Sequence, residues 1–214
     1  MIMRTITSQV NDFRSALGAY SDQYDLVPGE SEIARLCDYY RLLLAWNPRL
    51  HLVAPCSPAE FATRHVMESL LLLPHLGQKA RLADIGSGAG LPTIPVLIAR
   101  PDLHATLIEA SKRKSVFLRE ALRATRTLGQ ATVVAERFEN VQTPEVDYVT
   151  CRALDRFDEM LSRLVQWSPP GSTLLLFGGP DLRARIEILA LKFSTVHIPG
   201  SERRFLFVIQ TSIR

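Results

Sequence analysis

The sequence predicts a doubly wound α/β domain with a mostly parallel seven-stranded sheet, a terminal antiparallel hairpin and an N-terminal helical extension. Three observations predict it. From residue 80 onward, short β-rich runs alternate with helical segments; a glycine-rich loop follows the first run; and the last two runs are separated by only five residues. The preceding segment has helical periodicity instead. We therefore expect an extension over residues 1–79 and a sheet domain over residues 80–214.

Two helices are predicted in the N-terminal extension. Between residues 31 and 46, apolar side chains recur every three or four positions and make one helical stripe. We expect this helix to end at Asn47-Pro48, because proline lacks the backbone donor that a helix interior needs. A second helix should begin at the capping box Ser57-Pro58-Ala59-Glu60 and run to about Leu73.

From residue 80, strands and helices alternate at the spacing that right-handed parallel crossovers require. The expected strands span residues 81–85, 104–109, 131–135, 146–151 and 172–177, and the helices span residues 91–99, 112–126, 154–167 and 181–192. The last two runs, residues 193–198 and 204–211, are joined by a connection too short for a parallel crossover. They are expected to form an antiparallel hairpin.

Composition excludes several classes of protein. Of the 214 residues, 47% are hydrophobic and 22% are charged, unlike disordered, collagen-like or coiled-coil chains. No apolar run approaches the roughly 18 residues of a membrane span, and the N-terminus lacks a secretory signal, so we expect a cytoplasmic protein. Cys37, Cys56 and Cys151 include no Cys-x-x-Cys pair, which argues against a disulfide framework or a metal site. Without repeats or heptads, a monomer is expected.

Basic side chains are concentrated in two stretches, although the net charge is only +3. Residues 100–126 hold seven basic and three acidic side chains, and residues 183–214 hold six basic and two acidic ones. These stretches predict an anion-facing surface, with a solvated helix face and a basic tail as the alternative. Lys112, Arg113 and Lys114 occupy the first turn of a helix, where the macrodipole disfavours cations, which suggests contact with phosphates.

The glycine-rich loop Gly86-Ser87-Gly88-Ala89-Gly90 lies between a strand and a helix, where α/β sheets bind nucleotides. It does not fit a dinucleotide fingerprint, because the third glycine falls one residue early and Leu91 occupies the expected place. A Walker loop is also absent, since no Gly-Lys-Ser/Thr follows. The three glycines nevertheless let the backbone pass close to a ligand.

Two acidic residues are expected near this loop, one just before it and one at the end of the next strand. Asp84, two residues before the first glycine, would repel a pyrophosphate but suits an ammonium or sulfonium group. Glu109 ends the second strand, near the spacing at which an acid binds ribose hydroxyls. Together they predict a nucleoside that carries an amino acid, and S-adenosylmethionine is that ligand. The alternative is a tight glycine turn with incidental acids.

One stretch also carries a family resemblance. Residues 84–120, DIGSGAGLPTIPVLIARPDLHATLIEASKRKSVFLRE, resemble the bacterial small-subunit rRNA guanine-N7 methyltransferases, the RsmG or GidB family. The segments WNPRLHLVA, RHVMESLLLLPHL, ERFE and TCRALDRFDEML extend the resemblance nearly from end to end. Pro92 and Pro95 are more specific to this family than the glycines are, because few other methyltransferases share these prolines. The resemblance implies a Rossmann-like class I methyltransferase that uses S-adenosylmethionine to methylate N7 of a guanine in the 530 loop of 16S rRNA, in the small ribosomal subunit.

The resemblance also implies site residues. The cofactor contacts it implies, added to the acids and glycines above, are Gly86, Leu91, Phe138, Glu139 and Arg152. Phe138 and Glu139 would offer adenine an apolar face and an acceptor, unless Phe138 only caps a short helix. Arg152 would position substrate or cofactor, unless it pairs with Asp155 at the surface. Arg64 and His65 resemble an Arg-His pair of the family and are expected to bind RNA.

The sequence departs from the family's usual pattern at four positions. Glu68 replaces an aspartate, His51 an asparagine and Cys151 a serine, and Phe177 stands where a lysine usually precedes glycine. Any contact from that lysine is therefore missing. In the hairpin connection, Arg203-Arg204 are expected to be solvent charges.

Guanine N7 already has an in-plane lone pair, so its methylation requires no general base, and positioning is the main contribution. No catalytic residue is therefore assigned beyond Arg152 as a positioning candidate. Cys151 as a nucleophile is the weaker alternative to a small buried thiol, because Thr150 replaces the proline that usually precedes such a cysteine. A small-molecule methyltransferase and a non-catalytic RNA-binding module that holds the cofactor are the alternative functions.

Overall fold

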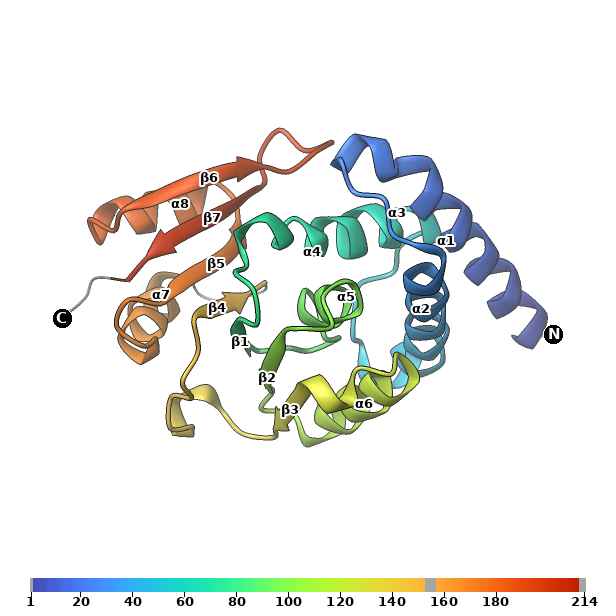
Figure 1. Cartoon of the computed structure of the whole chain (residues 1–214), viewed down its shortest axis with the longest axis horizontal. Helices are drawn as coiled ribbons and strands as arrows, with labels where there is room; N and C mark the ends of the chain where they lie inside the picture. Colours follow the sequence, from blue (N-terminus) through green and yellow to red (C-terminus); the bar gives the residue numbers. More distant parts are fainter. Residues whose placement is uncertain (1, 153–156, 212–214) are drawn as a thin grey trace.

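The computed structural model describes residues 2–152 and 157–211, and a seven-stranded sheet occupies its centre (Figure 1). The strands are β1 (Arg81–Ile85), β2 (His104–Ile108), β3 (Ala131–Val134), β4 (Tyr148–Cys151), β5 (Thr173–Gly178), β6 (Phe193–His197) and β7 (Phe205–Gln210). Their order is β3-β2-β1-β4-β5-β7-β6, in which β1 to β5 are parallel and β7 is antiparallel to both β5 and β6. The predicted α/β class and terminal hairpin are confirmed, and each strand lies within two residues of its expected bounds.

The helices pack on both faces of the sheet. They are α1 (Ile2–Tyr24), α2 (Glu30–Leu50), α3 (Pro58–Phe61), α4 (Glu68–Leu70), α5 (Thr93–Ala99), α6 (Lys112–Ala124), α7 (Phe157–Trp167) and α8 (Pro180–Ile188), with a π-helix over Ala62–Met67 and short 3₁₀ turns over Leu73–His75, Leu128–Gln130 and Phe138–Asn140. The start of the predicted helix over 154–167 lies partly outside the described residues. The structure therefore has three layers: helices α1 to α6, the sheet, and helices α7 and α8 on its other face.

Alternation along the strands divides the interior into two hydrophobic clusters. Leu82 and Leu175 belong to the cluster formed with helices α1 to α6, whereas their neighbours Ala83 and Leu176 belong to the cluster formed with α7 and α8. Because β1, β4 and β5 are covered on both faces, they appear in the sequence as nearly continuous apolar runs.

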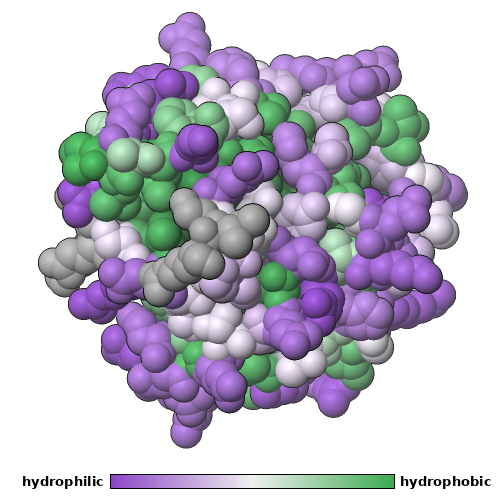
Figure 2. Space-filling model, turned by 60° about the vertical axis from the view of Figure 1, so that its left-hand side comes forward, coloured by the Kyte–Doolittle hydropathy of each residue, from purple (hydrophilic) through white to green (hydrophobic). Residues whose placement is uncertain are grey.

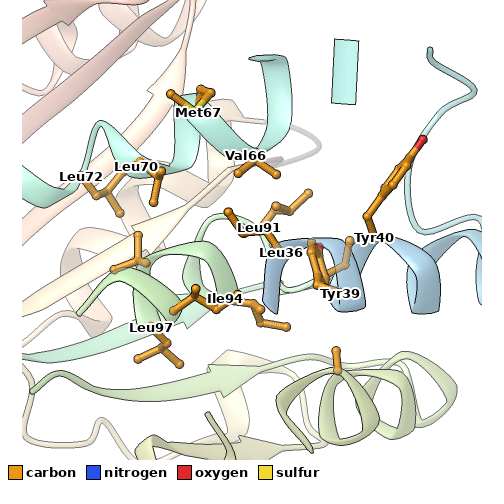
Figure 3. Close-up of a cluster of buried hydrophobic side chains, with 14 of the residues drawn as sticks. Leu36, Tyr39, Tyr40, Val66, Met67, Leu70, Leu72, Leu91, Ile94 and Leu97 are labelled. Atoms are coloured by element: carbon orange, nitrogen blue, oxygen red, sulfur yellow. The ribbon is translucent and has the colours of Figure 1, made fainter. Parts of the chain in front are cut away.

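The N-terminal helices share one core with the sheet. Tyr40 of α2 stacks on Phe13 of α1 and on Phe61 of α3, with ring centroids 4.5 Å and 4.7 Å apart. Earlier in α2, Leu36 and Tyr39 point toward the residues around α5 (Figure 3). Residues 6–79 therefore pack against the α5 and α6 face of the sheet without a break in the hydrophobic interior.

Two features of the N-terminal segment differ from the predictions. Helix α1 was not predicted, although Val10, Phe13 and Leu17 are buried at helical spacing. Helix α2 continues past Pro48 to Leu50, because a proline in the last turn removes only one backbone hydrogen bond.

The expected single helix after the capping box is instead divided. The capping box is present, with the Ser57 hydroxyl accepting from the Glu60 amide. The chain then passes through the π-helix Ala62–Met67 before α4. In this segment the backbone pairs five residues apart, as in the hydrogen bond from the Glu68 amide to the Thr63 carbonyl, and a side chain described below adds further donors to its carbonyls. Sequence periodicity does not distinguish such a segment from a regular helix.

The face shown in Figure 2 is mostly hydrophilic, with hydrophobic side chains gathered in limited areas between the charged ones. Among the helices of the described ranges, none is both long enough and apolar enough to cross a membrane.

The aromatic cluster between α1, α2 and α3 is expected to dominate the stability of the helical segment. Replacing the fully buried Phe61 by Ala (Phe61→Ala) should lower the free energy of unfolding by about 3–5 kcal/mol, through reduced burial and the cavity left behind. Urea denaturation measures this decrease. Tyr20→Ala, at an exposed aromatic of α1, is the control and should cost about 0.5 kcal/mol or less. Equal decreases for the two variants would contradict the assigned packing.

Candidate active site

The glycine-rich loop is held on the carboxyl end of β2. The amides of Gly86 and Ser87 both donate to the carbonyl of Ile108, over 2.8 Å and 3.2 Å. Gly86, Gly88 and Gly90 all have positive φ, a conformation that favours glycine.

The outer two glycines of the loop serve different purposes. A Cβ on Gly90 would lie 2.3 Å from Cδ1 of Ile94, so this glycine lets α5 pack against the loop. A Cβ on Gly86 would meet no atom within 4 Å, so the space above the loop is open to a ligand. The structure thus gives one of these two predicted loop residues open space and packs the other against α5.

Glu109 joins the loop to helix α6. Its carboxylate accepts hydrogen bonds from the amide of Gly88 (2.9 Å) and from the amide of Ser111 (2.7 Å), the residue that caps α6. The spacing in the sequence predicted that this acid lies near the loop, but it did not predict the hydrogen bonds from Glu109 to the backbone amides.

Asp84 is a buried carboxylate at the end of β1 that lacks a hydrogen-bond partner. It is 1% exposed, and neither carboxylate oxygen accepts a hydrogen bond from the described part of the chain. Burial raises its pKa to about 7; the nearby hydroxyls of Thr93 and Ser87 partly oppose the shift, without reaching hydrogen-bond geometry. Glu109 raises the pKa further and Arg152 lowers it. Such a group gains stability from a cationic ligand.

Helix α2 supports the same loop from the side of the helical extension. The fully buried Tyr39 donates a hydrogen bond from its hydroxyl to the carbonyl of Ala89, over 2.7 Å. Burial raises the pKa of Tyr39, so the hydroxyl keeps its proton. Tyr39 is a site residue that the sequence did not reveal, because it lies within the apolar stripe of α2 and looks like any other core position.

Arg152 connects the end of β4 to the π-helix. Its guanidinium donates to the carbonyls of Arg64 and His65, the latter over 3.1 Å, and pairs with Glu68 at 3.2 Å. It also lies 5.6 Å from the ring centroid of Phe177, in cation–π geometry. Arg152 thus adds donors to two carbonyls of the π-helix, and Phe177 offers this arginine an aromatic face in place of the family's usual lysine. The predicted alternative partner, Asp155, lies outside the described residues.

Glu68 is shared by two arginines. It is 2% exposed and binds Arg204 at 2.6 Å as well as Arg152 at 3.2 Å. Burial raises the pKa of Glu68, while the two guanidinium groups lower it. The expectation that Arg204 is a solvent charge is wrong, because the hairpin connection turns it toward α4; its neighbour Arg203 is exposed as expected.

Phe138 and Glu139 lie in the 3₁₀ turn after β3. The ring of Phe138 is buried and packs edge-on against Trp167, with centroids 5.9 Å apart, so Phe138 does anchor a short helix. Glu139 is partly exposed and pairs loosely with Arg163 at 3.6 Å.

Of the residues predicted to bind RNA, three are exposed cations. Lys112 and Arg113 are exposed in the first turn of α6, Lys114 is half-buried there, and Arg64 is exposed on the π-helix. His65 packs against Phe61, and its Nδ1 is buried without a partner among the described residues. Burial, followed by the charge of Arg152, lowers the pKa of His65 to about 3, so it is neutral at physiological pH.

Two departures from the family pattern also receive a structural account. His51 caps α2 with φ of 48°, a left-handed conformation that asparagine adopts readily, which is why the family's usual residue suits this position. Cys151 is a buried thiol on β4 beside α7 and α8, with 1% of its surface exposed. Within the described ranges, no group of three or more His, Cys, Asp or Glu side chains is arranged to hold a metal ion.

Comparisons with known proteins agree with this geometry. The GidB family, described as rRNA small subunit methyltransferase G, matches residues 32–201. A protein of Xanthomonas campestris pv. campestris (strain B100) named "Ribosomal RNA small subunit methyltransferase G" is 40% identical over 183 residues, 82% of this chain and 85% of that protein. Its counterpart in Xanthomonas axonopodis pv. citri is 38% identical over 83% of this chain and 86% of its own length.

Solved structures show the same fold at lower identity. An O-methyltransferase from Bacillus cereus, in complex with S-adenosylhomocysteine, matches with a TM-score of 0.60 and 16% identity, over 94% of this chain and 99% of that one. An RNA methyltransferase from Salinibacter ruber, with the same ligand, matches with a TM-score of 0.54 and 15% identity, over 76% and 95%. The fold is thus that of class I methyltransferases, and the chain belongs to the rRNA small subunit methyltransferase G family.

Proposed function

We propose that the protein transfers a methyl group from S-adenosylmethionine to N7 of a guanine in the 530 loop of 16S rRNA. Family membership supports an rRNA substrate and a methyl transfer. The observation that carries the cofactor assignment is Asp84, a buried carboxylate with unpartnered oxygens at the end of β1. Such a group fits the ammonium end of an amino acid.

The remaining contacts follow from the placement of the other predicted residues. Glu109 would accept from ribose hydroxyls with its remaining lone pairs, since each carboxylate oxygen has room for a second hydrogen bond. The backbone of the loop would contact the cofactor at Gly86, Gly88, Gly90 and Leu91. Because Phe138 is only 6% exposed, an adenine there would meet the backbone of the turn and Glu139 rather than the face of the Phe138 ring.

The bound cofactor supplies an electrophilic methyl group on a sulfonium. The task of the protein is to hold guanine N7 in line with that methyl group, and no side chain has to remove a proton. Arg152 is the positioning candidate, because β4 lies beside β1 with Thr150 opposite Asp84, and contacts to the π-helix fix the guanidinium. The neutral state of His65 is consistent with a site that runs without an acid–base pair.

We propose that the two parts of the chain, before and after residue 80, have different roles. Residues 80–214 would bind the cofactor, while residues 1–79 would support the loop through Tyr39 and present Arg64 to RNA. Lys112, Arg113 and Lys114 would contact rRNA phosphates beside the loop, because Ser111 is tied to Glu109. His65 would contribute contact but no positive charge. We further propose a cytoplasmic monomer whose partner is the small ribosomal subunit.

Methyl transfer tests the proposed function directly. Labelled S-adenosylmethionine is offered with deproteinised 16S rRNA and with 30S subunits from a strain that lacks the enzyme, and the product is mapped to the base. We expect N7-methylguanosine in the 530 loop. Transfer to a small molecule but to neither RNA would favour a small-molecule methyltransferase. Binding of both ligands without transfer would favour a non-catalytic module.

The pKa of Asp84 predicts a pH dependence of cofactor binding. A cationic ligand binds the carboxylate, so the affinity for S-adenosylmethionine should rise as the pH increases through about 7, the pKa of Asp84 in the free protein, and level off about one pH unit above it. Asp84→Asn should weaken binding about 10- to 100-fold at pH 7.5 and remove this dependence. Isothermal titration calorimetry measures both effects, with Asp38→Asn at an exposed carboxylate as the control. An Asp84→Asn variant with the wild-type pH profile would refute the assignment.

The cations at the start of α6 predict a salt-dependent RNA interaction. The combined change Lys112→Ala, Arg113→Ala and Lys114→Ala should raise the KM for rRNA and flatten its dependence on ionic strength, by up to about 0.9 in the log–log slope for each phosphate that is no longer neutralised. The affinity for S-adenosylmethionine should stay unchanged. Steady-state kinetics at several salt concentrations measures this. Unchanged KM and slope would remove these residues from the RNA-binding surface.

A further inference from the structure

A groove lies between α2 and α6, outside the cofactor site. These two helices lie side by side (Figure 1), and the groove between them has a volume of about 700 Å³. Its lining residues are Ala45, Trp46, Arg49, Leu50, Arg113 and Val116. Trp46 is half-buried and rests edge-on against Phe117, which fixes the indole in the groove. Val116 remains 47% exposed, although it is a large apolar side chain.

Positive charge borders this apolar surface, and the described residues supply no acidic partner for it. Arg49 comes from the last turn of α2 and Arg113 from the first turn of α6, and both are exposed. Neither forms an ion pair with any carboxylate in the described ranges, whereas Arg41 of α2 and Arg123 of α6 each pair with an acid on their own helix. An aromatic and aliphatic surface between two unpaired guanidinium groups is complementary to a nucleotide, which has an apolar base face and flanking phosphates.

The groove begins beside the cofactor loop. Arg113 lies two residues after Ser111, whose amide is bound by Glu109 together with that of Gly88. On the other wall, α2 contacts the loop through the hydrogen bond from Tyr39 to Ala89. Both walls are therefore fixed to the loop, and an RNA strand that leaves the reaction site along α6 would enter the groove.

We propose that this groove is an RNA subsite that binds an unpaired nucleotide next to the target guanine. Trp46 stacks on the base, and Arg49 and Arg113 contact the phosphates on either side. Because stacking on an aromatic ring tolerates any base, the groove would add affinity and register rather than sequence specificity. This inference rests on the proposed function and identifies how its RNA substrate is held.

Tryptophan fluorescence provides a local test, because the chain has only two tryptophans and Trp167 lies in the opposite cluster. In a Trp167→Phe variant, deproteinised 16S rRNA should quench the fluorescence of Trp46 with the same Kd as filter binding. In the matched Trp46→Phe variant, the remaining fluorescence should not respond. Equal quenching in both variants, or none in Trp167→Phe despite RNA binding, would overturn the proposal.

A second pair of variants tests the charged border. Arg49→Ala should raise the Kd for deproteinised 16S rRNA about tenfold at low salt and reduce the salt slope by about one. Arg123→Ala makes the same change in net charge at the far end of α6 and should leave both values unchanged. Identical behaviour of the two variants would overturn the proposal. Binding of S-adenosylmethionine should be unaffected in both.

The outcomes separate this inference from the proposed function. If the wild-type protein methylates rRNA while Arg49→Ala behaves like Arg123→Ala, the groove proposal fails and the proposed function stands. If the wild-type protein neither binds nor methylates rRNA, both fail. Quenching of Trp46 by 30S subunits but not by deproteinised rRNA that the protein binds and methylates would mean that a ribosomal protein covers the groove, which also overturns an RNA subsite.

Discussion

The buried carboxylate of Glu68 is the interaction on which the arrangement of the molecule depends. It binds Arg152 from the end of β4 and Arg204 from the connection between β6 and β7. These two arginines are 52 positions apart in the sequence, and Glu68 belongs to a third region, the helical segment. Transferring charges out of water is costly, and a buried group of this kind persists only when all members are paired. Glu68 therefore fixes three parts of the chain against one another at a single point.

The same junction explains the irregular helix between α3 and α4. Arg152 donates to the carbonyls of Arg64 and His65, both within the π-helix. The hydroxyl of Ser69 also donates to the His65 carbonyl. The π-helix and Arg152 thus form one hydrogen-bonded unit. It carries Arg64 to the surface close to β4 and leaves His65 half-buried and neutral.

Much of the sheet and of the cofactor loop could be predicted from the sequence, because those signals are local. Runs such as Arg81–Ile85 and Thr173–Gly178 are apolar and bounded by turn residues, and the loop glycines have a fixed spacing. The contacts that complete the site are not local. Nothing near Tyr39 indicates a hydrogen bond 50 residues away, and nothing near Arg204 indicates a partner 136 residues away. The predicted end of α2 at Pro48 was wrong, because the effect of a proline depends on which turn of the helix it occupies.

The double use of Glu109 has a consequence for ligand affinity. Its two oxygens are already oriented by the amides of Gly88 and Ser111 before any ligand binds. A hydroxyl that docks there meets an immobilised acceptor, so the side-chain entropy that binding normally removes was already given up on folding. Preorganisation of this kind makes the loop, the cap of α6 and the acid respond as one rigid unit. A substitution that shifts the backbone at Ser111 would therefore alter ligand affinity through geometry, even without touching the ligand.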